Sequence, residues 1–307
     1  MGVNVAWGWR FLRDRYSLAA LLILLLSIAF IIYSFWPRVT SSPHINVLED
    51  YVRVVQYLNK SSIALEGVLK GFGVSGYDFD DVYVVRMRLE RYLRNVSAVY
   101  GSDDSFFVGV AKSYLYVASA SVKGVEAYRN LNSSASTLRE SLELLALCRV
   151  DVALEKFGLV EDKVFGAMGS TASAIDILGG VNNSYLAENH VGVVNASLRR
   201  FKNVFESLQA AYNVMQIAKG YRDVVEALCR GERVGDQQLL AGLKKEVEDV
   251  KASGPLSLEV MNARSKLLSL IQQSMSGQGQ GSNGQGGSSS SQGVGSGAGY
   301  APPESDD

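Results

Sequence analysis

Apolar residues recur at alternating intervals of three and four positions along much of the chain. Three runs with this spacing are Leu48, Tyr51, Val55, Leu58, Ser62, Leu65, Leu69 and Phe72; Val82, Val85, Leu89, Tyr92, Val96 and Val99; and Leu198, Phe201, Phe205, Leu208, Tyr212 and Met215. The spacing places these side chains on one face of an α-helix, where a neighbouring helix can cover them. Residues 44–254 also contain no proline, the residue that most disrupts helices. The pattern therefore predicts an all-α protein.

The same pattern indicates eight helices. They span about residues 45–72, 80–100, 104–130, 137–157, 160–178, 184–230 with a break near Gly192, 236–252 and 257–275. We expect Asp78 or Asp80 to cap the second helix, and Thr137 with Glu140 to form a capping box at the fourth. Short connections make consecutive helices antiparallel. Residues 44–276 are therefore expected to form an elongated antiparallel bundle, either as one unit or as two halves, 44–157 and 160–275.

The third helix has an alternative. Residues 106–125 are rich in Val, Tyr and Ser, which also suit a strand. The small residues Ala111, Ala118 and Ser121 nevertheless fall at helical spacing. We therefore expect a closely packed helix here.

The most apolar segment lies near the start of the chain. Ser17 to Trp36 holds 20 residues without a charge. A helix of that length is about 30 Å long, which matches the hydrocarbon core of a bilayer. Aromatic residues flank it on both sides, as is typical of the headgroup level. The segment predicts a single transmembrane helix over 17–36, with the lipid bilayer as a partner.

Positive charges predict how this helix is oriented. Three arginines lie between residues 10 and 15, and only Arg38 follows the segment closely. Because positive charge is retained in the cytoplasm, residues 1–16 should be cytoplasmic and the chain beyond a linker, 37–43, extracytoplasmic. A cleaved secretory signal is the alternative, since residues 39–41 offer a small-residue cleavage site.

Composition separates the end of the chain from its body. Residues 277–307 consist mainly of Gly, Ser and Gln, which bury too little apolar area to offset the entropy of ordering, so we expect a disordered tail. The whole chain has a net charge of -1, which gives no electrostatic basis for binding nucleic acid.

The two cysteines are Cys148 and Cys229. In an exported domain an even number of cysteines favours a disulfide, which here would link the two proposed halves. Two buried free thiols are the alternative. With only two cysteines and two histidines, the usual zinc sites would need carboxylates as well, and we expect neither a metal site nor a cofactor.

Five Asn-x-Ser sequons lie on the side expected to be exported. Their asparagines are Asn59, Asn95, Asn132, Asn182 and Asn195. They are candidate glycosylation sites if the host glycosylates, and chance occurrence is the alternative. Asn182 is the strongest candidate because the preceding glycines, Gly179 and Gly180, predict an exposed loop.

These features favour a non-enzymatic function. We find no phosphate-binding glycine loop, paired-carboxylate signature or nucleophile elbow in the sequence. The leading hypothesis is a membrane-anchored scaffold or binding module of the cell envelope, whose partner is another membrane or envelope protein. The alternative is a ligand-sensing ectodomain or an accessory subunit of a membrane complex. The oligomeric state does not follow from the sequence.

Overall fold

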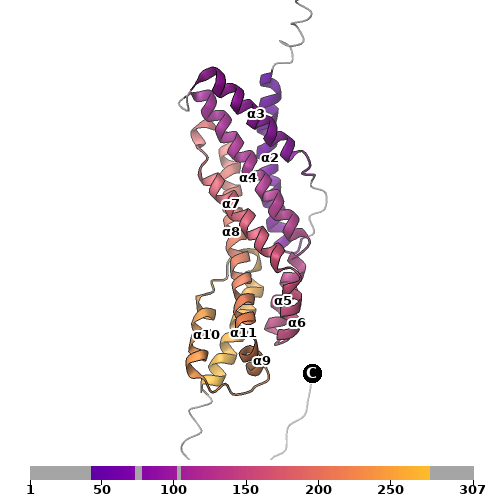
Figure 1. Ribbon diagram of the computed structural model, residues 1–307, viewed down its shortest axis with the longest axis vertical. Helices are drawn as coiled ribbons and strands as arrows, with labels where there is room; N and C mark the ends of the chain where they lie inside the picture. Colours follow the sequence, from indigo (N-terminus) through magenta and orange to yellow (C-terminus); the bar gives the residue numbers. More distant parts are fainter. Residues whose placement is uncertain (1–42, 73–77, 102–104, 277–307) are drawn as a thin grey trace, which may run out of the picture.

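The computed structural model describes residues 43–72, 78–101 and 105–276, and this part of the chain is all-helical. It contains ten α-helices and two short 3-10 helices, arranged as a long rod (Figure 1). The prediction of an all-α fold is confirmed. The predicted transmembrane segment 17–36 and the tail 277–307 lie outside the described residues. Within the described ranges, none of the helices has both the length and the apolar character needed to cross a membrane.

One end of the rod consists of five helices. They are α2 (Pro43–Leu69), α3 (Val82–Tyr100), α4 (Phe106–Asn132), α7 (Glu161–Gly179) and the first half of α8 (Glu188–Gly220). Helix α4 packs against α2, α3 and α7, and α8 packs against α2 and α7. A 3-10 helix, η1 (Asn183–Tyr185), connects α7 to α8.

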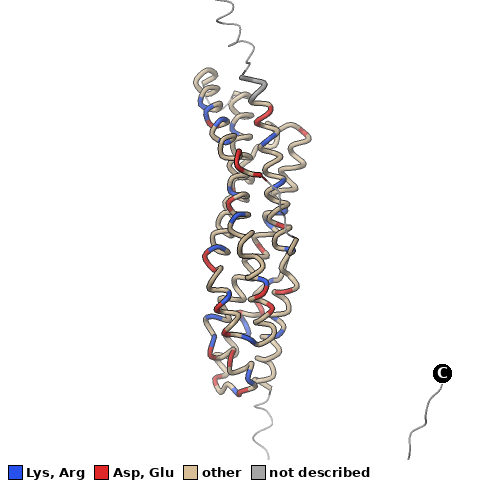
Figure 2. Tube along the Cα trace, turned by 90° about the vertical axis from the view of Figure 1, so that its right-hand side faces the viewer, with Lys and Arg blue, Asp and Glu red and all other residues tan. Residues whose placement is uncertain are grey.

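The other end is built around the second half of α8. It contains α5 (Ala135–Ala146), α6 (Val150–Gly158), α9 (Arg222–Cys229), α10 (Gln237–Asp249), η2 (Gly254–Leu256) and α11 (Ser257–Ser276). Helix α5 packs against α6 and α11, and α10 packs against α11. Basic and acidic residues are interspersed over the rod (Figure 2), which is the surface of a protein with balanced charge.

A single cluster of buried apolar side chains includes residues from every helix from α2 to α11. Its largest fully buried members are Phe157 of α6 and Phe201 of α8. Residues 44–157 and 160–275 therefore share this core. Most positions of the predicted seams are buried or half-buried, whereas Leu48, Phe72 and Val99, at seam ends, are exposed.

Residues 106–125 form the first part of α4, so the helical interpretation is confirmed. The helix packs closely against its neighbours because many side chains on its inward face are small. Gly124 faces α2 and α8 so tightly that an added Cβ would lie 2.6 Å from Ser61 Oγ and 2.8 Å from Phe201 Cζ. Ser121 instead donates a hydrogen bond to the Val54 carbonyl of α2, at 3.0 Å.

The sequence mispredicted where two helices are interrupted. The helix expected over 137–157 is broken at Cys148, which has a φ of 60°. The backbone N–H of Cys148 bonds to Leu145 O and that of Arg149 to Leu144 O, which is the pattern of a Schellman C-cap. The break expected near Gly192 does not exist, because α8 is continuous there and is interrupted only at Tyr221. Glycine lowers helix stability by only about 1 kcal/mol, which tertiary packing easily offsets.

The predicted N-caps were also wrong. Asp81 occupies the N-cap position of α3 and makes no capping bond, whereas Asp78 accepts a hydrogen bond from Asp80 N within the preceding turn. Thr137 lies inside α5, whose N-cap residue is Ser134. Ser134 Oγ donates to Asn130 O at the end of α4, so its hydroxyl serves the preceding helix instead.

Candidate functional site

A groove among the described residues lies between α8 and α10. Two adjoining cavities of about 370 and 510 Å³ form it, and they share Asn213, Asp249 and Val250. The lining side chains are mostly polar. Besides Asn213 and Asp249, the lining residues whose side chains can form hydrogen bonds are Glu206, Gln209, Gln216, Tyr221, Glu246, Lys251 and Ser253. We refer to this surface as the α8–α10 groove.

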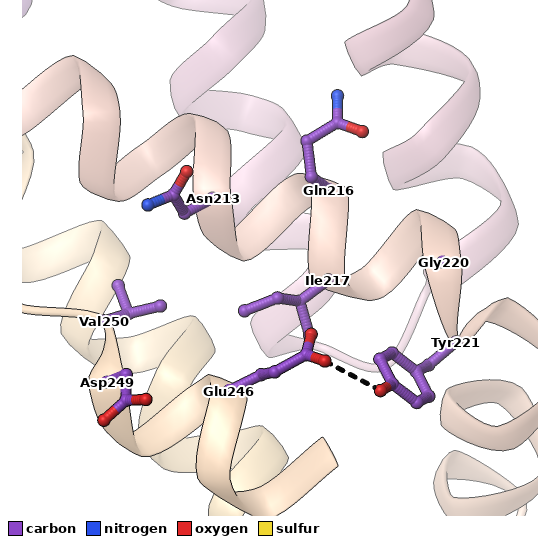
Figure 3. A pocket seen from close by; sticks show the side chains of 8 residues that line it. All are labelled: Asn213, Gln216, Ile217, Gly220, Tyr221, Glu246, Asp249 and Val250. Atoms are coloured by element: carbon purple, nitrogen blue, oxygen red, sulfur yellow. Dashed lines mark hydrogen bonds between the residues drawn. The ribbon is translucent and has the colours of Figure 1, made fainter. Parts of the chain in front are cut away.

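Tyr221 and Glu246 meet at one end of the groove (Figure 3). The Tyr221 hydroxyl donates to Glu246 Oε1 at 2.9 Å. This hydrogen bond raises the pKa of Tyr221, because the carboxylate stabilises the protonated phenol. In Figure 3 the Asp249 carboxylate does not point toward that of Glu246. The groove thus presents amide and carboxylate groups, which can form hydrogen bonds with a polar ligand.

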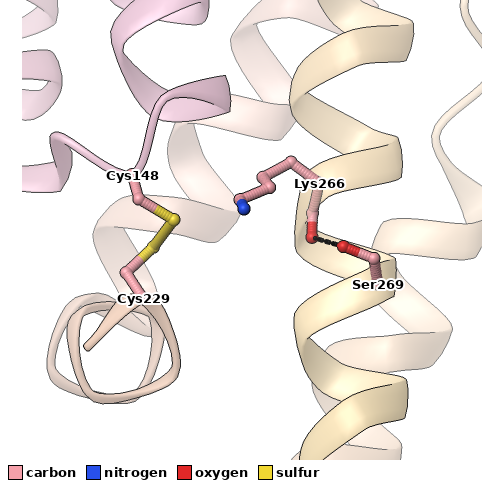
Figure 4. Close-up of a disulfide and its surroundings, with 4 residues drawn as sticks. All are labelled: Cys148, Cys229, Lys266 and Ser269. Atoms are coloured by element: carbon pink, nitrogen blue, oxygen red, sulfur yellow. Dashed lines mark hydrogen bonds between the residues drawn. A yellow bond between two sulfur atoms is a disulfide. The ribbon is translucent and has the colours of Figure 1, made fainter. Parts of the chain in front are cut away.

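Cys148 and Cys229 form a disulfide in the structure (Figure 4). Their Cα atoms are 5.4 Å apart, a normal separation for a disulfide. Cys148 lies in the turn between α5 and α6 rather than on the buried face of a helix, and Cys229 is the last residue of α9. Lys266 extends from α11 toward the bridge (Figure 4). The disulfide therefore fixes α9 to the α5–α6 turn.

An ion-pair network runs beside the disulfide. Arg222 of α9 pairs with Asp151 of α6, and its Nε donates to Glu226 Oε1 at 2.8 Å. These groups are largely exposed, so each pair adds little stability alone. Their effect is to align α6 and α9 where the disulfide crosses between them.

The five sequon asparagines have different surroundings. Asn95, Asn132, Asn182 and Asn195 are exposed. Asn59 is half-buried on α2, and its Oδ1 accepts a hydrogen bond from Arg200 Nη1 of α8 at 3.0 Å. Asn182 precedes η1, and its Oδ1 accepts from Ser184 N at 3.1 Å. A glycan on Asn59 Nδ2 would have to fit beside this contact between two helices, which sequence spacing could not indicate.

Several tyrosines pack between helices instead of lining the groove. The ring of Tyr51 stacks on that of Tyr114, with 3.9 Å between centroids, and the Tyr114 hydroxyl lies 2.7 Å from His190 Nδ1. Burial raises the pKa of Tyr51 and Tyr114 and lowers the pKa of His190, because it disfavours each charged form. Asp50, next to Tyr51, is buried, and burial raises its pKa against the opposing effect of Arg88. Burial thus favours the uncharged forms of Tyr51, Tyr114 and His190 where α2, α4 and α8 meet, whereas the Asp50 carboxylate pairs with Arg88, its oxygen 3.5 Å from Arg88 Nε.

No protein-family model, curated protein or solved structure shows significant similarity to this chain.

Proposed function

We propose that the chain is a membrane-anchored, extracytoplasmic helical-bundle protein that serves as a non-enzymatic scaffold or binding module of the cell envelope. The anchor is the uncharged segment 17–36, and the arginines before it favour a cytoplasmic N-terminus. The exported part is the rod of helices and the segment that follows it.

The observation that carries this proposal is the position of the two ends of the described chain. Helix α2 begins at one end of the rod and α11 finishes at the other (Figure 1). Helix α8, with 33 residues, is alone about 50 Å long. If the rod stands upright on the membrane that segment 17–36 spans, the end of α11 at Ser276 lies at least that far from the bilayer. Such a rod is suited to spacing and presenting a segment in the envelope.

The disulfide supports an extracytoplasmic location. Disulfides persist in oxidising compartments and are rare in the cytosol. The bridge between Cys148 and Cys229 closes a loop with a sequence separation of 81 residues. Linking the α5–α6 turn to α9 stiffens the end of the rod that lies farther from the proposed anchor, which suits a spacer.

A ligand-sensing ectodomain or accessory subunit is the second candidate, and the α8–α10 groove is the observation that favours it. A sensor should respond to a polar ligand in the groove. Asn213→Ala, at the point where the two cavities join, should then abolish the response, whereas the same change at the exposed Asn195 should leave it intact.

Limited proteolysis tests the topology. Protease added to intact cells should digest the chain beyond residue 43 and leave a fragment that contains 1–36. The control is the same treatment after lysis, when the N-terminal fragment should also be cleaved. Protection of the body in intact cells, with cleavage after lysis, would reverse the orientation and overturn the proposal.

Crosslinking in intact membranes tests the scaffold role. If the segment 277–307 is what the rod presents, its deletion should abolish specific crosslinks to an envelope protein without affecting membrane insertion. The matched control replaces the segment with a Gly/Ser sequence of equal length. Crosslinks that survive deletion but disappear when α8–α10 groove residues are replaced would favour the sensor instead.

A further inference from the structure

The end of the rod at which α2 begins carries a group of aromatic side chains. Tyr100 ends α3, Phe106 and Phe107 begin α4, and Tyr185 lies in η1. Their rings contact one another in sequence, with centroid separations of 5.1 Å for Tyr100–Phe107, 5.9 Å for Phe106–Phe107 and 5.8 Å for Phe106–Tyr185. Three helical segments thus contribute to one patch.

Most of this patch is exposed. The exposed fractions are 75% for Val99, 55% for Tyr100, 61% for Phe106 and 51% for Phe107. We call these four residues the aromatic tip. The Tyr185 ring packs against the backbone of Gly109 in α4. A Cβ added to Gly109 would lie only 2.6 Å from Tyr185 Cζ, so the glycine leaves room for this ring. Large apolar side chains grouped in contact on a surface indicate a binding surface rather than scattered exposure.

Contacts among three tyrosines show which positions of α2, α3 and α4 lie at the same height along the rod. Tyr51 of α2 contacts both Tyr114 of α4 and Tyr92 of α3, with ring centroids 3.9 and 6.4 Å apart. The three residues therefore lie at one level of the rod.

From that level, each helix continues for eight residues toward the same end. Helix α2 begins there at Pro43, α4 begins at Phe106, and α3, which runs the opposite way, finishes at Tyr100. Eight residues of α-helix rise about 12 Å. The start of α2 and the aromatic tip consequently lie at the same height, as Figure 1 shows for the ends of these helices.

The length of chain before α2 limits how far this end can be from the proposed membrane. The predicted span ends at Trp36, and residues 37–42 separate it from Pro43. Even fully extended, such a linker reaches no more than about 25 Å. The aromatic tip is therefore on the end of the rod that the anchor keeps next to the bilayer.

We propose that the aromatic tip inserts into the interface between headgroups and acyl chains of the bilayer in which the chain is anchored. Phe supplies apolar area, and Tyr combines an apolar ring with a hydroxyl that stays hydrated, which is the preference of aromatic residues at this interface. This inference rests on the proposed membrane anchor. Contact at both the anchor and the tip would hold the rod upright on the membrane.

The residues of the aromatic tip carry no charge. The insertion should therefore depend on apolar contact and should occur with zwitterionic phosphatidylcholine alone.

Depth-dependent fluorescence quenching tests the proposal in the full chain. A cysteine introduced by Val99→Cys is labelled with an environment-sensitive fluorophore, with the native disulfide left oxidised. The protein is reconstituted in phosphatidylcholine vesicles that carry a nitroxide on the acyl chain. The label at 99 should lose most of its fluorescence. A label at the exposed position 272, introduced by Gln272→Cys at the far end of α11, should keep its fluorescence.

Matched aromatic variants test the role of the tip. Phe106→Ser with Phe107→Ser should restore the fluorescence of the label at 99. Phe165→Ser is the control, because Phe165 of α7 is 62% exposed but is not part of the tip. Restoration by both changes would show a general loss of structure and would overturn the specific role of the tip.

Flotation of the same vesicles separates the two proposals. If the chain does not float with the vesicles, the anchor itself fails and the tip proposal falls with it. If the chain floats but the label at 99 is not quenched, the anchor stands and the tip proposal is overturned. A blue-shifted label at 99 that is insensitive to nitroxide lipid would show that a protein surface, a second copy included, covers the tip, and would also overturn it.

Discussion

Arg139 of α5 links three helices. Its Nε donates to Glu259 Oε1 of α11 at 2.8 Å, and its Nη2 donates to the carbonyl of Leu69 at the C-terminus of α2. The side chains of Arg139 and Glu259 are only 22% and 16% exposed. One guanidinium thus satisfies a helix-terminal carbonyl and joins the sequence-distant α2, α5 and α11.

Arg139→Ala should therefore destabilise the fold. Loss of this partly buried guanidinium removes the hydrogen-bond donor of Glu259 and the donor that Arg139 supplies to Leu69 O, at a cost of about 1–3 kcal/mol. Arg230→Ala is the control, since its pair with Glu232 is more than half exposed and should contribute little. The measurement is denaturant unfolding of the full chain in detergent, followed by circular dichroism. Equal losses in the two variants would contradict the assignment.

A second prediction concerns Cys148. Cys148→Ser with Cys229→Ser should lower stability by up to about 4 kcal/mol, because the unfolded chain regains the freedom that the cross-link removes. In the unreduced, denatured protein, thiol reagents should label neither cysteine before reduction. Two labelled thiols under these conditions would show that the disulfide does not form in the protein.

The backbone at Cys148 provides a sharper comparison. A φ of 60° is costly for a residue with a Cβ and easy for glycine. Cys148→Gly with Cys229→Ser should therefore be more stable than the double serine variant by about 1 kcal/mol. The end of α9 already has this arrangement, with Gly231 at a φ of 75°. A glycine variant no more stable than the serine variant would contradict the C-cap assignment.

The sequence predicted the helices well where one apolar face repeats and less well where a helix ends. The break at Cys148 was missed because cysteine is an unusual residue at a left-handed C-cap and the apolar spacing continues across it. At Gly192 the opposite error arose, since the residue suggested a break but is exposed inside α8 with nothing within 4 Å of an added Cβ. Helix ends depend on which partner each terminal backbone group finds, and this is decided by tertiary contacts.

The candidate surfaces were even less accessible to sequence reasoning. The α8–α10 groove combines Asn213 with Glu246 and Asp249, which lie more than 30 positions away. The aromatic tip needs the packing of Tyr185 beside Phe106, which four connections between helices separate along the chain. The cysteine pair was within reach of the sequence because only two cysteines were available to join.

A third prediction compares two glycines in helix interiors. Gly124→Ala should destabilise the protein by about 1–3 kcal/mol, because the new methyl group overlaps Phe201 and Ser61. Gly169→Ala in α7 should stabilise it by up to about 1 kcal/mol, since an added Cβ there meets nothing within 4 Å and alanine favours helix. Unfolding midpoints of the two variants should move in opposite directions. A shift of both in the same direction would show that α4 is not packed as closely as the structure has it.

A fourth prediction concerns pH. Burial holds the pKa of His190 below its ordinary value of 6.5, and its ring Nδ1 lies 2.7 Å from the Tyr114 hydroxyl. The folded chain consequently binds this proton more weakly than the unfolded chain does. The neutral imidazole contributes its full stability above about pH 6.5, and that contribution is lost as the pH falls through the lower folded pKa.

The variant His190→Gln isolates this effect. It keeps a polar side chain at the Tyr114 hydroxyl but does not titrate, whereas the raised pKa of Asp50 acts equally in both proteins. Between about pH 7.5 and about pH 5, the wild-type chain should lose more unfolding free energy than the variant does. Denaturant unfolding at the two pH values measures the difference. A wild-type chain that loses no more stability than His190→Gln would show that His190 is as accessible to protons in the folded state as in the unfolded one, and that its contact with Tyr114 does not hold it neutral.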